Sequence, residues 1–246
     1  MARIFLRGPA RPEGLVSLAP RFELKWVAGQ RGKPSINADI LSATEAVREI
    51  ADPEFEVLGV GATSALSTFN VEGGITFTTA GANGDEMILV PHLDANQAAW
   101  GTVTWGTDRE TRWECEIQSG ANITAAIIWA GLKLTNTEVL VTDADQVFFR
   151  YEDDVNAGEW VAVDSIANTD VSTDTNIAVA VSTKYHLRID IDAARIARMY
   201  INGILVRTTT ALTAVDLIPY IGVACDGAGA AKALNIYGQT ISRVSA

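Results

Sequence analysis

Five carboxylates gather near the middle of the chain, in the stretch DADQVFFRYEDD. Carboxylate oxygens are preferred ligands of calcium, which needs about six to eight oxygens converging from several directions. The spacing lacks the Asp-x-Asp-x-Asp-Gly run of an EF-hand loop, so a solvated acidic turn is the simpler interpretation. We expect no bound metal and no cofactor, and the residues to test for calcium are Asp143, Asp145, Glu152, Asp153 and Asp154.

Asp190 and Asp192 form a second carboxylate arrangement, because residues two apart in a strand point to the same face. Retaining glycosidases use two carboxylates about 5–5.5 Å apart. Here the sequence continues with Ala-Ala-Arg instead of a third carboxylate, and Arg198 is predicted to lie opposite Asp190. The sequence also contains no Gly-x-Ser-x-Gly nucleophile motif and no phosphate-binding glycine loop. We therefore interpret the aspartates as part of a surface ion pair and expect no enzymatic activity.

The six tryptophans are enough for an aromatic sugar-stacking site, but they are also what the core of a sandwich contains. Trp113 and Trp129 lie in strongly apolar runs and are expected in the core. Trp100 and Trp105 lie in a segment rich in Gly and Thr, AAWGTVTWGTD, where we expect exposure. Because an exposed aromatic ring can stack on a sugar, Trp100 and Trp105 are the candidate glycan-binding residues.

The elements that position these side chains are best defined in the meander of residues 185–207, YHLRIDIDAARIARMYINGILVR. Asn202-Gly203 between apolar runs predicts a two-residue type I′ hairpin, because that turn needs positive φ at both positions. Burying Ile189 on the same face then requires a loop of residues 193–195, since a slip of one residue would bury the charges. The predicted pairs are Ile201 with Ile204, Met199 with Val206, Ala197 with Thr208, and Ile189 with Met199.

The opposite face of this meander carries Asp190, Arg198 and Arg207 in one row. Two arginines directly opposite one another would repel, and Asp190 beside Arg198 compensates for that repulsion. We interpret the row as sheet surface and not as an active site.

Short apolar runs recur from about residue 55 to the end, separated by turn-forming residues, whereas long stretches with helical spacing are nearly absent. This pattern predicts an all-β fold, a two-sheet antiparallel jelly-roll sandwich over residues 55–246. Residues 1–54 are predicted to form an extended N-terminal arm. Within the arm, the capping box of Ser42 and Glu45 predicts one short helix near residues 43–50.

The arm is basic, whereas the rest of the chain is acidic. Residues 1–36 hold seven basic and two acidic residues, although the whole chain carries a net charge of −11. Its prolines break both helix and strand ladder, and its large apolar residues indicate that it packs on this sandwich or on a neighbouring subunit. Docking on an acidic protein surface is favoured over nucleic acid, because the cations are spaced apart and the body is acidic. The predicted partner-binding residues are Arg3, Phe5, Leu6, Arg7, Arg11, Leu15, Leu18, Arg21, Phe22 and Trp26.

Membrane insertion and secretion are not expected. No apolar run approaches the roughly 20 residues that span a bilayer, and the first residues lack the apolar region of a cleaved signal peptide. Cys115 and Cys225, the two cysteines, lie in apolar strand-like runs and are expected as buried thiols, with a disulfide as the alternative.

The last third of the chain resembles a known family. The strand YHLRID, the hairpin RMYINGILV and the closing segments IGV and LNIYGQ are similar to the aromatic-His strand, the Tyr-x-Asn-Gly hairpin and the last strands of concanavalin-A-like and laminin-G-like lectin-type sandwiches. More loosely, this ending beside a centre rich in Trp and Thr resembles virion structural proteins of tailed bacteriophages. The resemblance does not assign a catalytic role to any residue of this chain.

The resemblance implies a non-enzymatic virion protein, made in the host cytoplasm. Its expected role is a capsid decoration or cement protein, anchored by the arm to the major capsid protein or other virion proteins, with closed homo-oligomeric symmetry such as a trimer. The alternative is a lectin-like carbohydrate-binding module of a tail or fibre that adsorbs to host glycans through Trp100 and Trp105. Neither hypothesis involves nucleic acid or a membrane.

Overall fold

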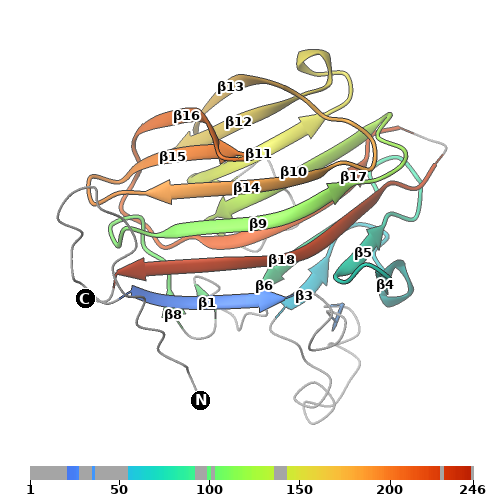
Figure 1. The fold of residues 1–246 in the computed structure, drawn as a ribbon, viewed down its shortest axis with the longest axis horizontal. Coiled ribbons are helices and arrows are strands. Elements are labelled where there is room, and N and C mark those ends of the chain that lie inside the picture. Colours follow the sequence, from blue (N-terminus) through green and yellow to red (C-terminus); the bar gives the residue numbers. More distant parts are fainter. Residues whose placement is uncertain are drawn as a thin grey trace, which may run out of the picture.

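The fold is a sandwich of two eight-stranded sheets with a small separate hairpin (Figure 1). We call the sheet drawn nearer the viewer in Figure 1 the front sheet and the other the back sheet, and each has an inner face toward its partner and an outer face. The predicted all-β, two-sheet jelly-roll class is confirmed, whereas the predicted helix near 43–50 lies outside the described residues. This computed structural model describes residues 21–27, 35–36, 55–91, 99–100, 103–135, 143–227 and 230–244.

The front sheet is antiparallel and has the order β16-β15-β14-β9-β18-β5-β4, with β1 also paired to β18. β5 and β1 follow one another along the same side of β18, because they pair with different stretches of it, 233–236 and 238–244. Its strands are β1 (Arg21–Val27), β4 (Ser67–Phe69), β5 (Ile75–Thr78), β9 (Arg112–Ser119), β14 (Lys184–Ile191), β15 (Ile196–Ile201), β16 (Ile204–Ala211) and β18 (Ala233–Val244).

The back sheet has the order β13-β12-β11-β10-β17-β6-β3-β2 and is antiparallel except for the parallel pair of β2 and β3. Two short 3-10 turns and the hairpin of β7 and β8 complete the described elements. The back strands are β2 (Ser35–Ile36), β3 (Phe55–Leu58), β6 (Glu86–Pro91), β10 (Ala126–Lys133), β11 (Gln146–Glu152), β12 (Glu159–Ile166), β13 (Thr169–Ala178) and β17 (Ile218–Cys225); the remaining elements are η1 (Ser64–Leu66), η2 (Asn156–Gly158), β7 (Ala99–Trp100) and β8 (Val103–Thr104).

The main core lies between the two inner faces. In β9, Trp113, Cys115 and Ile117 are buried while Glu114 and Glu116 point outward, which is the alternation that the sequence predicts for a half-buried strand. β10 is buried on both faces, as expected for a central strand. Each large apolar side chain that is fully buried in this core stabilises the fold by about 1.5–3 kcal/mol.

The predicted meander forms, with one correction. Ile201 pairs with Ile204, Ile189 pairs with Met199, and Asn202-Gly203 adopts positive φ at both positions, as predicted. The other two predicted pairs are wrong, because β-bulges shift the register between β15 and β16, so that Met199 faces Arg207 and Arg198 faces Thr208. Arg207 therefore leaves the predicted charged row and pairs with Asp164 of the back sheet, the atoms Nη2 and Oδ1 being 3.0 Å apart.

Part of the predicted arm belongs to the sandwich itself. β1 pairs along β18, and β2 pairs with β3, so both sheets include strands from within residues 1–54. Phe22 packs on the main core, its ring 6.0 Å from that of Trp105, and Arg21 donates to the carbonyl oxygen of Glu110. These contacts are intramolecular, so packing of this segment on the sandwich itself accounts for them, and binding of a partner by Phe22 and Arg21 stays a prediction. The backbone of Trp26 lies in β1, and the seven predicted arm residues from Arg3 to Leu18 fall outside the described residues.

Cys115 and Cys225 are both buried free thiols, so the expected reduced state is confirmed and the disulfide alternative is not. Within the described ranges, none of the helical segments has the length and apolar character needed to cross a membrane.

Candidate functional site

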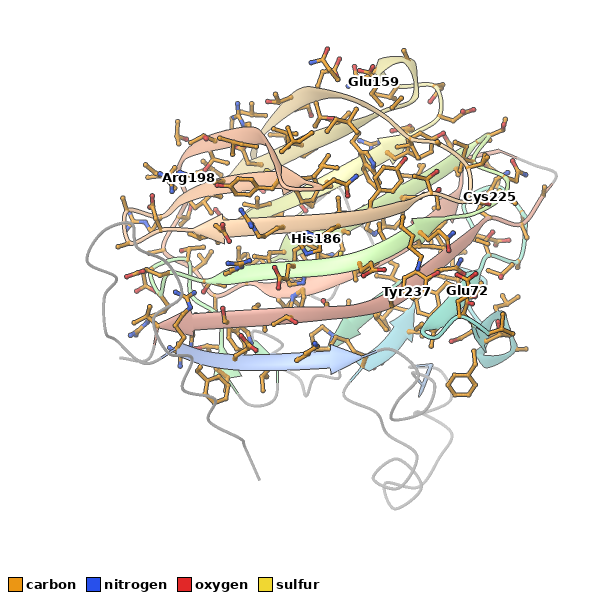
Figure 2. All side chains as sticks on the ribbon, viewed as in Figure 1. Glu72, Glu159, His186, Arg198, Cys225 and Tyr237 are labelled. Atoms are coloured by element: carbon orange, nitrogen blue, oxygen red, sulfur yellow. The ribbon has the colours of Figure 1, made fainter. Side chains whose placement is uncertain are left out.

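A hollow of about 430 Å³ opens on the outer face of the front sheet. Its lining comes from five strands, β1, β9, β14, β15 and β18, and from the turns beside them. We call it the front hollow; its lining residues are Arg21, Glu23, Lys25, Glu110, Thr111, Arg112, Glu114, Asp190, Ile191, Asp192, Arg198, Thr240 and Ser242. The side chains of this face project toward the viewer in Figure 2, where Arg198 and His186 are labelled.

The front hollow has nearly balanced charge, with four basic and five acidic side chains. Arg112 joins two of the acids: its Nη2 lies 2.9 Å from Glu114 and its Nε lies 3.4 Å from Asp190. Asp190 Oδ2 also lies 3.2 Å from Arg188 Nε, so each oxygen of this carboxylate faces an arginine: Oδ1 faces Arg112 and Oδ2 faces Arg188.

Asp192 organises the loop at one end of the hollow. Its carboxylate accepts hydrogen bonds from the backbone N–H groups of Ala194 and Ile196 and pairs with Arg198 at 2.9 Å. Partial burial of the carboxylate raises the pKa of Asp192. The hydrogen bonds from Ile196, Arg198 and Ala194 outweigh this effect, so the pKa is lowered from its ordinary value. The predicted surface pair of Asp190 and Arg198 is therefore rearranged: the two residues are opposite in register, but each finds a different ionic partner.

Beyond the hollow, the same face carries tyrosines covered by cations. Lys184 Nζ lies 4.1 Å from the ring centre of Tyr237, and Arg188 lies 3.9 Å above the ring of Tyr200. The Tyr237 hydroxyl donates to Gln118 Oε1 at 2.6 Å. Both rings are half-buried. The face beyond the hollow therefore consists of tyrosine rings with basic side chains packed on them.

His186 is exposed at the centre of this face, and its Nε2 lies 3.7 Å from Glu114. Because Glu114 also contacts Arg112, a chain of ionisable groups connects His186 to the front hollow. His92, the other histidine, lies outside the described residues.

The five calcium candidates do not form one site. Asp143 and Asp145 precede β11, whereas Glu152 ends it and Asp153 and Asp154 follow it, so the seven-residue strand separates the two groups by about 23 Å. Asp143 accepts two hydrogen bonds from Thr135, and Asp153 accepts one from the backbone of Ala125. The five candidates are therefore divided between the two ends of β11, and the expectation that they hold no metal stays a prediction.

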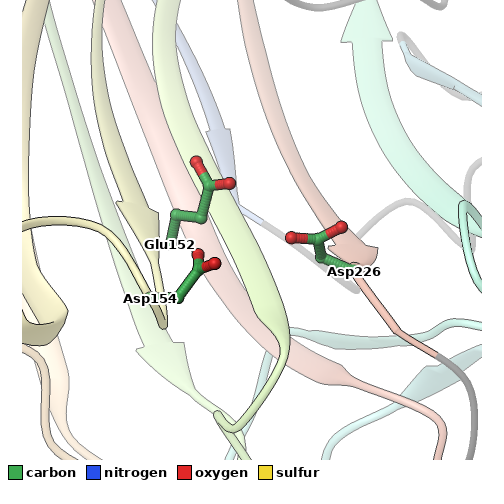
Figure 3. Close-up of side chains that lie close together, drawn as sticks. All are labelled: Glu152, Asp154 and Asp226. Atoms are coloured by element: carbon green, nitrogen blue, oxygen red, sulfur yellow. The ribbon is translucent and has the colours of Figure 1, made fainter.

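The fold instead brings Asp226 to Glu152 and Asp154, with one oxygen of each carboxylate within 4.8 Å of the others (Figure 3). Asp226 follows β17, and no local sequence signal links it to the end of β11. Glu152 already pairs with Arg150, and three carboxylates supply only part of the oxygen shell that calcium needs. Calcium binding here stays untested.

The predicted exposure of Trp105 is wrong, because this side chain is fully buried. The backbone around it bonds to the segment before β17, with Leu217 N donating to Trp105 O and Thr107 N donating to Val215 O. Those bonds fix the Gly-rich and Thr-rich segment against the sandwich, so that the indole enters the core. The side chain of Trp100 lies outside the described residues.

Sequence reasoning missed the contribution of β1 to the front hollow. Arg21, Glu23 and Lys25 line it, while Phe22 and Leu24 between them pack on the core. The signal that was overlooked is the alternation of polar and apolar residues in RFELKW, which is the two-residue period of a half-buried strand.

No protein-family model and no curated protein sequence matches the chain. Several solved structures match in fold. A protein of unknown function from Shewanella oneidensis MR-1 has a TM-score of 0.57 at 11% identity, with 91% of this chain and 86% of that chain covered. The alginate lyase Aly36B, in complex with alginate trisaccharide, has a TM-score of 0.53 at 10% identity over 91% and 98%. The carbohydrate recognition domain of Emp46p has a TM-score of 0.51 at 10% identity over 82% and 93%.

These matches show that the chain shares the jelly-roll sandwich of lectin and lyase domains. They also correct the expectation that the chain is not an enzyme, because alginate lyases recur among the structures with this fold. At these identities the matches establish the fold alone, so the activity has to be argued from the site.

Proposed function

We propose that this chain binds a carbohydrate in the front hollow. The observation that carries the proposal is the lining itself, in which five strands bring basic, acidic and hydroxyl side chains together around one open hollow. Sugar hydroxyls donate and accept hydrogen bonds at once, so a wall of both kinds suits them. The volume falls within the range of about 300–1,000 Å³ that is usual for small-molecule sites.

A neutral glycan fits this site better than a polyanion. The hollow holds one more acidic than basic side chain, and the whole chain carries a net charge of −11. A polymer of uronates would therefore meet unfavourable long-range electrostatics on approach.

A matched pair of variants on β9 tests this proposal. Glu114 lines the hollow, whereas Glu116 points to the same side of the strand and pairs with Lys184 outside the hollow. After a glycan array has identified a ligand, calorimetry should show that Glu114→Ala weakens binding about tenfold or more, since a charge-assisted hydrogen bond is worth about 1.5–3 kcal/mol. Glu116→Ala should leave the affinity unchanged. Equal affinities for both variants would place the glycan elsewhere.

A polysaccharide lyase acting on the same face is the second candidate. The observation that favours it is the exposed His186 beside Glu114, since a histidine held by a carboxylate is suited to proton abstraction. In such an elimination the base takes the proton next to a sugar carboxylate, the glycosidic C–O bond breaks, and the leaving oxygen takes up a proton from solvent. Incubation with a panel of uronate polysaccharides, followed by ultraviolet absorbance of the unsaturated product, tests it. His186→Ala should abolish the product, and an inactive wild-type protein would eliminate this candidate.

A role as a capsid decoration protein anchored by the N-terminal segment stays a prediction. A deletion that tests this role must leave β1 intact, because removal of residues 2–34 would also remove a strand that pairs along β18. Deleting residues 2–20 instead leaves β1 in place. Undiminished attachment of that truncated protein to particles would contradict anchoring by the segment.

A further inference from the structure

A second group of polar side chains lies on the outer face of the front sheet, beyond the front hollow. It differs from the hollow because all of its members are uncharged amides and hydroxyls. In Figure 2, Tyr237 of this group and Arg198 of the hollow lie on opposite sides of His186. We call the group the neutral cluster; its members are partly exposed and come from β5, β9, β18 and the turn after β4, namely Asn70, Thr76, Gln118, Asn235 and Tyr237.

Hydrogen bonds fix the side chains of the neutral cluster relative to one another. Gln118 is at the centre, where its Oε1 accepts from Asn235 Nδ2 at 3.0 Å and from the Tyr237 hydroxyl at 2.6 Å. Thr76 Oγ1 donates to Asn235 Oδ1 at 2.6 Å, and Gln118 Nε2 donates to the carbonyl oxygen of Ser182 at 2.9 Å. Among the described residues, each of these two amides thus uses one of its two N–H donors, which leaves the other for a ligand hydroxyl.

A β-bulge in β18 contributes the tyrosine of this cluster. β18 has an extra residue, Tyr237, between the pairs that Ile236 and Gly238 make with β9. On its other side, β18 changes neighbour at the same point, from β5, which pairs up to Ile236, to β1, which pairs from Gly238 onward. Bulges re-aim side chains and occur often beside functional sites. The irregularity therefore lies where the ligand-binding groups of the cluster gather.

The neutral cluster lies in line with the front hollow along β9. Glu114 of the hollow and Gln118 of the cluster point to the same outer face, because they are an even number of residues apart in one strand. Four residues of a strand span about 13 Å. Glu116, between them, already has an ionic partner. The hollow and the cluster are therefore two ends of one row of outward side chains.

We propose that the glycan of the front hollow is an oligosaccharide that runs along β9, and that the neutral cluster binds its far units. This inference rests on the proposed function, because it takes the hollow as the first part of the site. Neutral amides and a phenol hydrogen-bond sugar hydroxyls without the cost of removing a charge from water. Lys184 packs on the Tyr237 ring at 4.1 Å, so the cluster offers its polar atoms to the sugar and not the face of the ring.

Calorimetry with neutral oligosaccharides of increasing length tests the extent of the site. The probes are gluco-oligosaccharides and manno-oligosaccharides, each from the disaccharide to the hexasaccharide. A disaccharide occupies the hollow alone, whereas a hexasaccharide also reaches the neutral cluster. Two or three added hydrogen bonds should raise the affinity about tenfold or more. Equal affinities along the series would confine the glycan to the hollow and overturn this inference, while the proposed function would stand.

Tyr237→Phe and Tyr200→Phe form a matched pair of variants. Each removes the hydroxyl of a tyrosine on this face that is covered by a cation, but only the Tyr237 hydroxyl belongs to the neutral cluster. Tyr237→Phe should weaken binding of the hexasaccharide about two- to tenfold and leave the disaccharide unchanged. Tyr200→Phe should change neither affinity.

The hollow variant Glu114→Ala separates the two proposals, because it should weaken binding of both probes. A Tyr237→Phe protein that binds both probes as the wild type does, or that loses affinity for both equally, would overturn the role of the neutral cluster. An unchanged affinity in Glu114→Ala, or a wild-type protein that binds none of the probes, would overturn the hollow as the glycan site, and this inference with it.

Discussion

The two outer faces of this sandwich have opposite characters. On the front sheet, charged side chains pair along and across strands and surround an open hollow, as the ionic contacts of Arg112 illustrate. On the back sheet, the corresponding positions hold Trp129, Phe148 and Tyr220, all buried. An antiparallel sheet with one face in water needs apolar residues on the other face only, so the central back strands, which bury apolar residues on both faces, differ from the half-buried strands of the front sheet. The comparison teaches that the two outer faces differ in character: the front face carries an open, charged hollow, whereas the back face carries a buried cluster of large apolar side chains.

The largest expected effect comes from truncating the aromatic layer of the back face. Trp129→Ala removes a side chain that is 2% exposed and should lower the free energy of unfolding by about 3–5 kcal/mol, the range for large aromatic residues in cores. Tyr200→Ala on the front face should cost less than about 1.5 kcal/mol, because that ring is only half-buried. Urea denaturation measures both. Similar losses would show that the faces are equally packed and would remove the contrast between them.

Loss of an ion pair should also destabilise the fold more on the back sheet than on the front sheet. The pair of Lys133 and Asp143 on the back sheet is 1% and 6% exposed, whereas that of Lys184 and Glu116 on the front sheet is 49% exposed on both sides. Asp143→Ala should destabilise by about 3 kcal/mol, because it removes the carboxylate beside a buried ammonium. Glu116→Ala should cost about 0–1 kcal/mol. Thermal unfolding of both variants at matched salt would measure the difference, and a costly Glu116→Ala would contradict it.

The smallest effect should be a pH dependence at the front hollow. Hydrogen bonds keep the pKa of Asp192 below its ordinary value, so this residue stabilises the fold above the unfolded pKa near 4. That contribution is lost as the pH falls through the folded pKa. With the side chain a third exposed, we expect about 0.5 kcal/mol or less. The difference in unfolding free energy between wild type and Asp192→Ala should be constant above about pH 5 and shrink below about pH 4. A difference that grows as the pH falls would contradict the lowered pKa of Asp192.

The sequence predicted most of the fold but little of the candidate site. The hairpin at Asn202-Gly203 and the alternation in β9 follow from local turn chemistry and from the two-residue period of a strand, so their registers were predictable. The shift at β16 was not, because a β-bulge depends on how the sheet twists. Asp226 joins Glu152 only through contact between distant strands, which one sequence does not reveal.

By itself, then, the sequence determined the all-β class, the alternation that fills the core, the buried thiols and the turn geometry, since each depends on residues close together in the chain. Only the tertiary structure decided that β1 would complete the front hollow, that Trp105 would enter the core, and that Arg207 would turn from the charged row to Asp164. It also decided that the outer face of the front sheet would carry an open hollow and that of the back sheet a buried apolar cluster. Such outcomes depend on which strands become neighbours, and neighbours in these sheets are often separated by a hundred residues or more, as β9 and β18 are.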